Sequence, residues 1–258
     1  MNEIKISFNT VLLVVLMIVG LVGTSGYFYG KSSKVSGETT TATPTSAKPK
    51  EITIDQVKDL FNDKNIAFGN KDSKLLFVEF SDPSCPYCHV AAGKNGDLNK
   101  QMGQQFILKA DGGTYVAPVP EMKKLVDAGI AAYVWIYANG HGNGELATVA
   151  QYCAQEKGKF WEVHDLLMSD KGYEMLNTTV KTDKTKTGVL ADFLDSAVKS
   201  SDMKACIDSG KYESRLTQDM AIAKEFGFQG TPSFFVNTTN FSGAYSFTDM
   251  QVAIDGAK

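Results

Sequence analysis

Residues 75–89 have the sequence LLFVEFSDPSCPYCH, with cysteines at positions 85 and 88. The apolar run 75–80 is short, carries Phe and Val, and is interrupted by one carboxylate, Glu79, which is typical of a buried parallel strand rather than of a helix. The Ser-Asp-Pro-Ser segment that follows breaks the strand. We therefore expect a strand, a short turn and then a helix that begins at the cysteines.

The position of the first cysteine has a chemical consequence. A helix start offers unpaired backbone N–H groups and the positive end of the helix dipole, and both stabilise a thiolate. Cys88 lies one turn further along the same helix face, close enough to form a disulfide with Cys85. Pro86 suits the first helical position because its φ is preset and its missing N–H would be unpaired there.

A Cys-x-x-Cys pair is either a redox dithiol or half of a zinc site. Zinc requires about four ligands. Cys153 and Cys206 lie far apart and singly, and the chain has three histidines, so no second half-site is available. We favour the redox interpretation and expect neither a metal nor a cofactor.

The composition places broad bounds on the protein. Its 258 residues are 43% hydrophobic and 21% charged, enough for a sizeable core in one domain or in a domain with a large insertion. The net charge is -3, and beyond residue 50 there are 21 basic and 27 acidic side chains. This acidic balance argues against nucleic-acid binding.

The N-terminal region carries a membrane-insertion signal. Residues 6–30 contain no charged side chain, and the aliphatic run 11–23 has the length of a signal-peptide core. Aromatic residues at 27–29 extend the run to about the 20 residues that span a bilayer. Because these aromatics precede Lys31 and no Ala-x-Ala cleavage site is present, we predict an uncleaved anchor over 1–30, with a cleaved signal peptide as the alternative.

The segment 31–50 is rich in Ser, Thr, Pro and Lys. Such a composition buries little apolar surface, so we expect an extended and mobile linker.

The remaining chain alternates between strand and helix patterns. Convincing strand signals stand at 66–68, 75–80, 131–137, 233–236 and 243–245, with weaker ones at 106–108 and 114–116. Helices are expected after Thr53, at 121–128, throughout 145–226 and from Thr248 onward. Strands, a helical block and strands again indicate an α/β domain with an all-helical insertion.

A glycine-rich segment, GHGNG at 140–144, follows the strand 131–137 and precedes a helix. Its spacing does not fit the dinucleotide fingerprint G-x-G-x-x-G, so we interpret it as a loop.

Four phrases carry a resemblance to a known family. They are VEF with CPYC at 78–88, CAQEKGKFWEVH at 153–164, ACIDSG at 205–210 and GTPSFFVN at 230–237. In this order they resemble the DsbA-type thiol:disulfide oxidoreductases, over about residues 65–255. The resemblance implies a thioredoxin-like fold formed by 51–144 and 228–258, with a helical insertion at 145–227.

The resemblance also implies site residues. Cys85 would be the attacking cysteine and Cys88 its partner, Pro232 would be a cis-proline facing them, and Thr231 would pair with the substrate backbone. We accordingly expect four residues to contact the substrate: Pro86, Tyr87, Thr231 and Pro232. Because of Gly93 and Gly96 the helix after the cysteines is shorter than is usual in the family, and the segment 93–118 has no counterpart that we can place.

By this resemblance the protein oxidises dithiols of other proteins on the extracytoplasmic side of a membrane, and a membrane redox partner recycles its disulfide. Two alternatives stay open. A tethered reductase or isomerase would share every residue named above. A non-enzymatic tethered binding module would use the cysteines as a structural disulfide.

Further polar and cysteine residues have alternative interpretations. An unpaired Glu79 in an apolar strand would have a raised pKa and could exchange a proton with Cys88, whereas an ion pair with a lysine would be purely structural. His89 would either favour the thiolate or lie on the surface, and we expect His164 to be packed. Cys153 and Cys206 would pair in an oxidising compartment and contribute about 4 kcal/mol, or else remain two buried thiols.

Overall fold

The computed structural model describes residues 51–257, so the predicted anchor and linker at 1–50 lie outside the described residues. In the part that is described, no helix combines the length and the hydrophobicity that a bilayer span requires.

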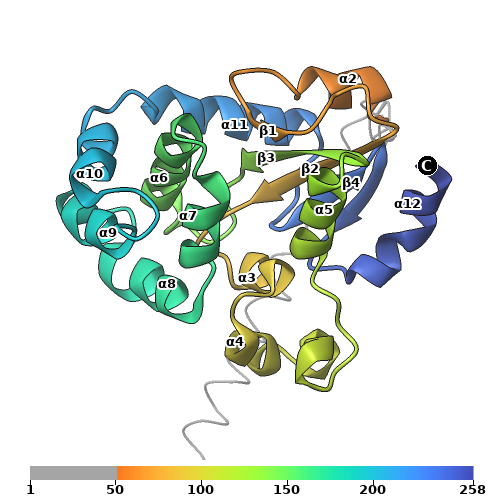
Figure 1. Ribbon diagram of the computed structural model, residues 1–258, viewed down its shortest axis with the longest axis horizontal. Coiled ribbons are helices and arrows are strands. Elements are labelled where there is room, and N and C mark those ends of the chain that lie inside the picture. Colours follow the sequence, from red (N-terminus) through yellow and green to blue (C-terminus); the bar gives the residue numbers. More distant parts are fainter. Residues whose placement is uncertain (1–50, 258) are drawn as a thin grey trace, which may run out of the picture. The chain divides into compact units, whose positions relative to one another are not determined.

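A five-stranded sheet in the order β1-β3-β2-β4-β5 forms the centre of the described chain (Figure 1). Its strands are β1 (Ile66–Phe68), β2 (Leu75–Ser81), β3 (Ala131–Tyr137), β4 (Ser233–Val236) and β5 (Thr239–Ser242). β2 and β3 are parallel, and every other neighbouring pair is antiparallel. All seven residues of β2 and of β3 are buried, which is why both strands are almost continuously apolar in sequence.

Helices cover both faces of this sheet. On one face Leu76, Val78 and Phe80 of β2 pack with α2 (Ile54–Asp59) and the end of α11 (Glu213–Glu225). On the other face Leu75 and Phe77 pack with α3 (Pro86–Ala92), α5 (Pro118–Asp127) and the C-terminal α12 (Gln251–Ala257). Alternate residues of β2 therefore face opposite helical layers, and Glu79 and Ser81 belong to the α3 side.

The chain between β3 and β4 is helical and has a hydrophobic core of its own. It comprises α6 (Glu145–Glu156), α7 (Phe160–Leu167), α8 (Asp170–Glu174), a π-helical turn (Met175–Val180), α9 (Thr187–Phe193), α10 (Ser200–Asp208) and α11. In Figure 1 this block, coloured green to blue, stands at one end of the sheet. Within it a disulfide joins Cys153 of α6 to Cys206 of α10, with the Cα atoms 6.0 Å apart.

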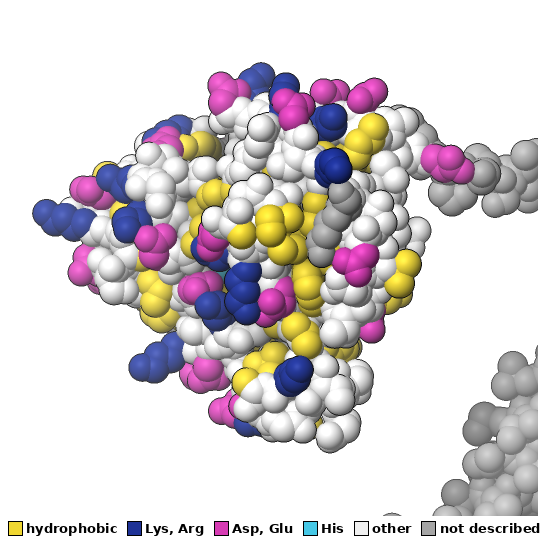
Figure 2. All heavy atoms as spheres, turned by 45° about the vertical axis from the view of Figure 1, so that its right-hand side comes forward, with side chains coloured by type: hydrophobic (Ala, Val, Ile, Leu, Met, Phe, Trp, Pro, Cys, Tyr) yellow, Lys and Arg dark blue, Asp and Glu magenta, His cyan; other side chains and the backbone are white. Residues whose placement is uncertain are grey.

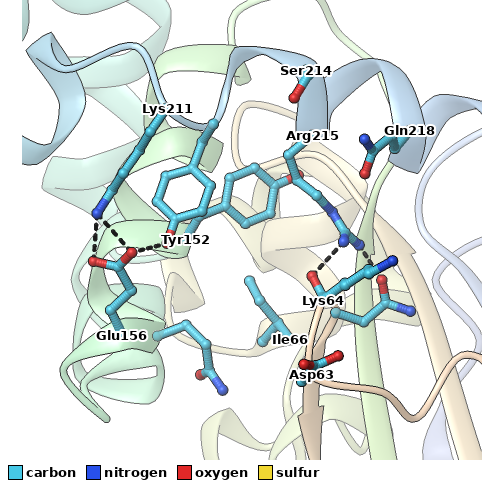
Figure 3. A pocket seen from close by; sticks show the side chains of 12 residues that line it. Asp63, Lys64, Ile66, Tyr152, Glu156, Lys211, Ser214, Arg215 and Gln218 are labelled. Carbon is cyan, nitrogen blue, oxygen red and sulfur yellow. Dashed lines mark hydrogen bonds and ion pairs between the residues drawn. The ribbon is translucent and has the colours of Figure 1, made fainter.

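Arg215 of α11 connects the helical block to the first strand (Figure 3). Its Nε donates to Oδ1 of Asp219 at 2.8 Å, and its guanidinium also donates to the carbonyl of Lys64 and to the side chain of Asn65. Asp219 in turn accepts a hydrogen bond from the hydroxyl of Tyr152 on α6 at 2.7 Å. Arg215, Asn65 and Tyr152 border a pocket of about 470 Å³, whose opposite wall carries the ion pair of Lys211 with Glu156.

The surface around α5 and α12 carries charges of both signs. In Figure 2, which brings this side forward, Lys and Arg side chains alternate with Asp and Glu and with small hydrophobic areas. This face therefore presents no continuous basic stripe of the kind that binds nucleic acid.

The weak strand signals between α3 and α5 were wrong. The structure has α4 (Gly96–Gln101) and two 3-10 turns, Gln104–Phe106 and Lys109–Asp111, and only one isolated bridge joins Leu108 to Tyr115. The apolar residues that gave those signals, Phe106 and Tyr115, instead pack edge to face with ring centroids 5.6 Å apart.

The C-terminal strand was also misplaced. β5 precedes the predicted segment 243–245, because Gly243 with φ +120° turns the chain away from the sheet. β5 is an edge strand whose residues are mostly exposed and polar, so it lacks the hydrophobic alternation that marks a half-buried strand. The closing helix starts as a 3-10 turn, Phe247–Met250, which Ser246 caps.

Candidate active site

The Cys-x-x-Cys pair lies at the start of α3. Cys85 is the N-cap residue, Pro86 occupies the first helical position, and Gly93 ends the helix in the left-handed conformation with φ +63°. Both cysteines are free thiols. Cys88 is fully buried and Cys85 is 4% exposed, so only the edge of the first cysteine reaches solvent.

The surroundings of Cys85 favour its thiolate. Hydrogen bonding by the Cys88 thiol lowers the pKa of Cys85 to about 7, although burial opposes this, and Thr231 and the backbone N–H groups of Cys88 and Tyr87 act in the same direction as the thiol. The two backbone N–H groups are unpaired donors of a helix start. Cys85 is therefore partly ionised at neutral pH.

Cys88 has the opposite property. Burial, and then the proximity of Cys85, raise its pKa well above the ordinary thiol value, even though its sulfur accepts the backbone N–H of Asp82 at 3.4 Å. The two thiols, three residues apart, thus differ strongly in acidity.

The residues expected to contact a substrate lie around Cys85. The Thr231–Pro232 peptide bond is cis, and the Cys85 thiol donates to the carbonyl of Thr231 at 3.4 Å. Tyr87 is 43% exposed and packs edge to face against Phe106, with centroids 5.8 Å apart. Pro86 and Thr231 are half-buried, and Pro232 is buried. That these residues bind a substrate stays a prediction.

Asp82 is a site residue that the sequence analysis missed. It is fully buried, and its Oδ1 accepts the N–H and the hydroxyl of Ser84 at 2.8 and 2.7 Å. Its Oδ2 accepts the N–H groups of Gly140 and His141 at 3.0 and 2.8 Å. One carboxylate therefore joins the cysteine turn to the glycine-rich loop 140–144.

A signal for this contact was present in the sequence. Parallel neighbouring strands end at the same sheet edge, so the turn after β2 and the loop after β3 must meet. The glycines provide the space: a Cβ on Gly140 would lie 1.8 Å from Oγ1 of Thr231, and one on Gly144 would lie 1.9 Å from Oδ1 of Asp82.

Glu79 lies beneath α3, 1% exposed. The Tyr133 hydroxyl donates to its Oε2, whereas Oε1 has no protein partner. Burial raises the pKa of Glu79, and the charge of His164 and the hydroxyls of Tyr133 and Ser81 partly oppose this. The ion pair with a lysine that we considered is not formed. The Ser81 hydroxyl also acts to lower the pKa of Cys88, so it lies near both the buried carboxyl and the buried thiol.

Neither interpretation of His89 was correct. The ring is fully buried, and its two nitrogens lie 2.8 Å from the carbonyl of Pro83 and 3.0 Å from that of Met168. Burial lowers the pKa of His89 to about 4, against the effect of these two carbonyls. His89 is therefore neutral at pH 7 and supplies no positive charge to Cys85. It packs α3 against the end of α7 instead.

Comparisons with known proteins agree with this geometry. Residues 119–256, more than half of the chain, match the family model described as thioredoxin. A Rickettsia conorii protein whose name assigns it provisionally as a protein-disulfide oxidoreductase is 26% identical over 220 residues, covering 84% of this chain and 69% of that protein. Disulfide bond formation protein D of Bacillus subtilis is 21% identical over 192 residues, covering 72% of this chain and 74% of that protein.

Solved structures show the same fold. Oxidised BdbD of Bacillus subtilis superposes with a TM-score of 0.53 at 19% identity, covering 75% of this chain and 92% of that one. α-DsbA1 of Wolbachia pipientis gives 0.56 at 16% identity, covering 78% and 95%. The predicted thioredoxin-like fold with its helical block is confirmed. The chain belongs to the thioredoxin family.

Proposed function

We propose that this protein is a thiol:disulfide oxidoreductase that oxidises dithiols of protein substrates through a Cys85–Cys88 disulfide. The observation that carries the proposal is the contrast within the pair: Cys85 has a pKa of about 7, and the pKa of Cys88 is raised well above the ordinary value. A low pKa makes Cys85 a good leaving group in exchange reactions. The edge position of Cys85 beside Pro232 leaves it as the sulfur that a substrate can reach.

The reaction has two exchange steps. A substrate thiolate attacks the sulfur of Cys85, forms a mixed disulfide and releases Cys88 as a thiolate, which then takes up a proton. The second substrate thiol, as a thiolate, attacks the substrate sulfur of the mixed disulfide and releases the Cys85 thiolate. Two electrons pass from the substrate dithiol to the enzyme, and the helix start stabilises the product thiolate.

Glu79 is the proposed proton donor for Cys88. A buried Cys88 thiolate is costly, so the proton must come from a group within the site. Glu79 retains its proton more readily than an ordinary carboxyl, and Ser81 lies near both groups. During reoxidation the proton moves in the reverse direction.

The proposed location is extracytoplasmic, with 1–30 as the membrane anchor and a membrane redox protein as the recycling partner. The Cys153–Cys206 disulfide supports this location, because structural disulfides persist mainly in oxidising compartments.

The direction of the reaction is tested by the redox potential. A Cys85 pKa of about 7 matches that of the thioredoxin nucleophile rather than the much lower value of DsbA, which favours a tethered reductase as the second candidate. We expect a potential between about -120 and about -230 mV for an oxidase. The purified chain is equilibrated in glutathione buffers and the fraction of free thiol is determined. A value near about -270 mV or below would assign the protein as a reductase.

Exchange itself is tested by trapping. Cys88→Ser removes the resolving thiol, so this variant should accumulate mixed disulfides through Cys85, detectable by non-reducing electrophoresis of cell extracts. Cys85→Ser is the matched control and should trap nothing. If Cys88→Ser traps no protein while the wild type is active, the roles of the two cysteines are wrongly assigned.

A further inference from the structure

A layer of polar atoms without close partners lies on the α3 side of the sheet. Across the parallel pair, Glu79 stands opposite Trp135, and Ser81 stands opposite Tyr137. Four atoms of these residues are buried without a hydrogen bond of good geometry to another protein atom: Glu79 Oε1, Ser81 Oγ, Trp135 Nε1 and the Tyr137 hydroxyl. Buried polar atoms are normally satisfied, and ordered water usually supplies the missing bonds. This layer is therefore suited to conduct protons beneath Cys88.

His164 of α7 is linked to this layer through Trp161: the His164 and Trp161 rings lie 5.5 Å apart between centroids, and Trp161 lies 5.4 Å from the ring of Tyr133, the hydrogen-bond partner of Glu79. His164 is 1% exposed, and its Nε2 is buried without a protein partner. Its Nδ1 lies 3.2 Å from Oδ1 of Asp165, a contact that assigns the Nδ1 hydrogen and leaves Nε2 as the acceptor of the neutral ring. Its charge acts on Glu79, so the two side chains lie within electrostatic reach of each other.

His164 also lies at the wall of a surface pocket, although almost none of its own surface is exposed. Together with Trp161 and Asp165, it lines a pocket of about 270 Å³ that Lys94 and Lys123 border. The Asp165 side chain is half-exposed, and its Oδ2 pairs with Lys94 at 2.5 Å. His164 thus connects the buried layer with a solvent-accessible pocket that none of the predicted substrate-binding residues lines.

The proposed reaction requires such a connection. Glu79 gives a proton to Cys88 or receives one from it in every cycle, but it is buried against Tyr133 and cannot exchange that proton with bulk water directly. A substrate bound at Cys85 would also block proton exchange with solvent past the cysteines.

We propose that His164 is the positioning and relay residue through which Glu79 exchanges its proton with solvent. After Glu79 has protonated the Cys88 thiolate, the His164 imidazolium passes a proton from Nε2 to the Glu79 carboxylate, across the water-suited layer. The proton that makes the ring an imidazolium enters at Nδ1 from water in the pocket at Asp165, so the transfer leaves a neutral ring with its hydrogen on Nδ1, where the contact with Asp165 holds it. In reoxidation each transfer runs in reverse, so no proton is created or lost. The inference rests on the proposed function of Cys85, Cys88 and Glu79.

The charges around His164 suit this role. Two carboxylates provide counter-charges for the His164 imidazolium. Glu79 of β2 lies inside the layer, and Asp165 of α7 lies at the pocket. The titratable groups of other elements near His164 are His89 of α3, which its charge affects, and three lysines that line the same pocket: Lys94 after α3, and Lys123 and Lys124 of α5. His89 stays neutral at pH 7, since burial lowers its pKa to about 4, and the Lys94 charge is paired with Asp165.

The test separates the two exchange steps in the full-length chain. Reduced protein is mixed with oxidised glutathione, quenched at intervals, alkylated and analysed by mass spectrometry. Formation of the glutathione disulfide at Cys85 is the first step, and its resolution by Cys88 is the second. We expect His164→Gln to leave the first rate unchanged within about twofold and to slow the second by about tenfold or more at neutral pH, with its pH profile moved to higher pH. Glu162→Gln, an exposed residue of the same helix that does not line the pocket, is the control and should change neither rate.

A double-substitution cycle distinguishes a relay from a packing effect. If His164 acts through Glu79, adding His164→Gln to Glu79→Gln should produce no further slowing of resolution. An additive loss, or a wild-type resolution rate and pH profile in His164→Gln, would overturn the inference. If His164→Gln does not fold, Asp165→Asn at the pocket should slow resolution by about threefold, and an unchanged rate there would likewise overturn it. Failure of the proposed function gives a different result, because no glutathione disulfide would then form on Cys85 in the wild type.

Discussion

At the scale of single residues, the site depends on two cysteines that share a helix but not an environment. Cys85 is the N-cap of α3, where donors converge on its sulfur, and Cys88 is one turn deeper in a fully buried position. The opposite pKa shifts follow from these two positions, because hydrogen bonds stabilise the charged thiolate and burial destabilises it. The three-residue spacing therefore places Cys85 where its thiolate is stabilised and Cys88 where its thiolate is destabilised, which makes Cys85 the more reactive thiol.

Glu79 provides a prediction about stability and pH. Burial raises the pKa of Glu79 in the folded protein above its value in the unfolded chain. As the pH rises through about 4.5, the unfolded chain releases this proton while the folded protein retains it, so the wild type loses stability until the pH passes the folded pKa. Glu79→Gln does not titrate, and we expect it to stabilise the protein by at least about 1 kcal/mol near pH 8 and to have little effect near pH 4.

Denaturant unfolding of the reduced protein at several pH values measures this difference. Glu121→Gln, at a half-buried residue of α5 that pairs with Lys124, is the control and should change stability by less than about 0.5 kcal/mol at any pH. A Glu79→Gln variant that is less stable than the wild type over the whole pH range would show that the carboxylate is compensated inside the protein.

At the scale of elements, the site is a junction of three loops. Asp82 joins the turn after β2 to the loop after β3, and that loop in turn touches Thr231 before β4. The geometry around Cys85 therefore depends on how closely the backbone at Gly140 approaches Thr231.

Gly140→Ala tests this dependence. Its Cβ would lie 1.8 Å from Oγ1 and 2.9 Å from Cβ of Thr231, so the two loops must separate. We expect a loss of about 1–3 kcal/mol in the free energy of unfolding and a slower reaction of Cys85 with a peptide disulfide by about tenfold or more. Gly230→Ala is the matched control, because a Cβ at that position would have no atom within 4 Å and its φ is not positive. Equal rates for both variants would mean that the loop contact does not position Thr231.

The elements differ in how well the sequence predicts them. β1, β3 and β4 match the predicted ranges and β2 exceeds its range by one residue, because buried strands are apolar throughout and are bounded by turn residues. β5 was missed because an exposed edge strand has no such pattern. The partner of Glu79 could not be found either, because the register that places Tyr133 near it is set by the pairing of β2 and β3 and not by either sequence alone.

At the scale of the whole described domain, the sheet and the helical block have separate hydrophobic cores. The sheet and its covering helices carry the dithiol, and the helical block packs around a separate set of side chains that includes Cys153. The buried pair of Arg215 and Asp219 connects the block to the sheet, because Arg215 donates to the carbonyl of Lys64 and to Asn65 before β1, and Asp219 accepts the backbone N–H of Tyr137 in β3. The block also reaches the site at α7, where His164 acts on Glu79 and the carbonyl of Met168 lies against His89.

The Cys153–Cys206 disulfide gives the last prediction. It closes a sequence separation of 53 residues inside the helical block, so the chain-entropy relation gives about 4 kcal/mol of stabilisation. We expect the double variant Cys153→Ala/Cys206→Ala to lower Tm by about 10 °C in calorimetry. Both cysteines are replaced because a single substitution would leave a free thiol able to pair with Cys85. Since Cys85 and Cys88 cluster with Ala92 and Met168 rather than with the core around Cys153, the redox potential of the dithiol should stay the same within about 10 mV. A shifted potential with an unchanged Tm would reverse the assignment, making this disulfide part of the redox site rather than a support of the fold.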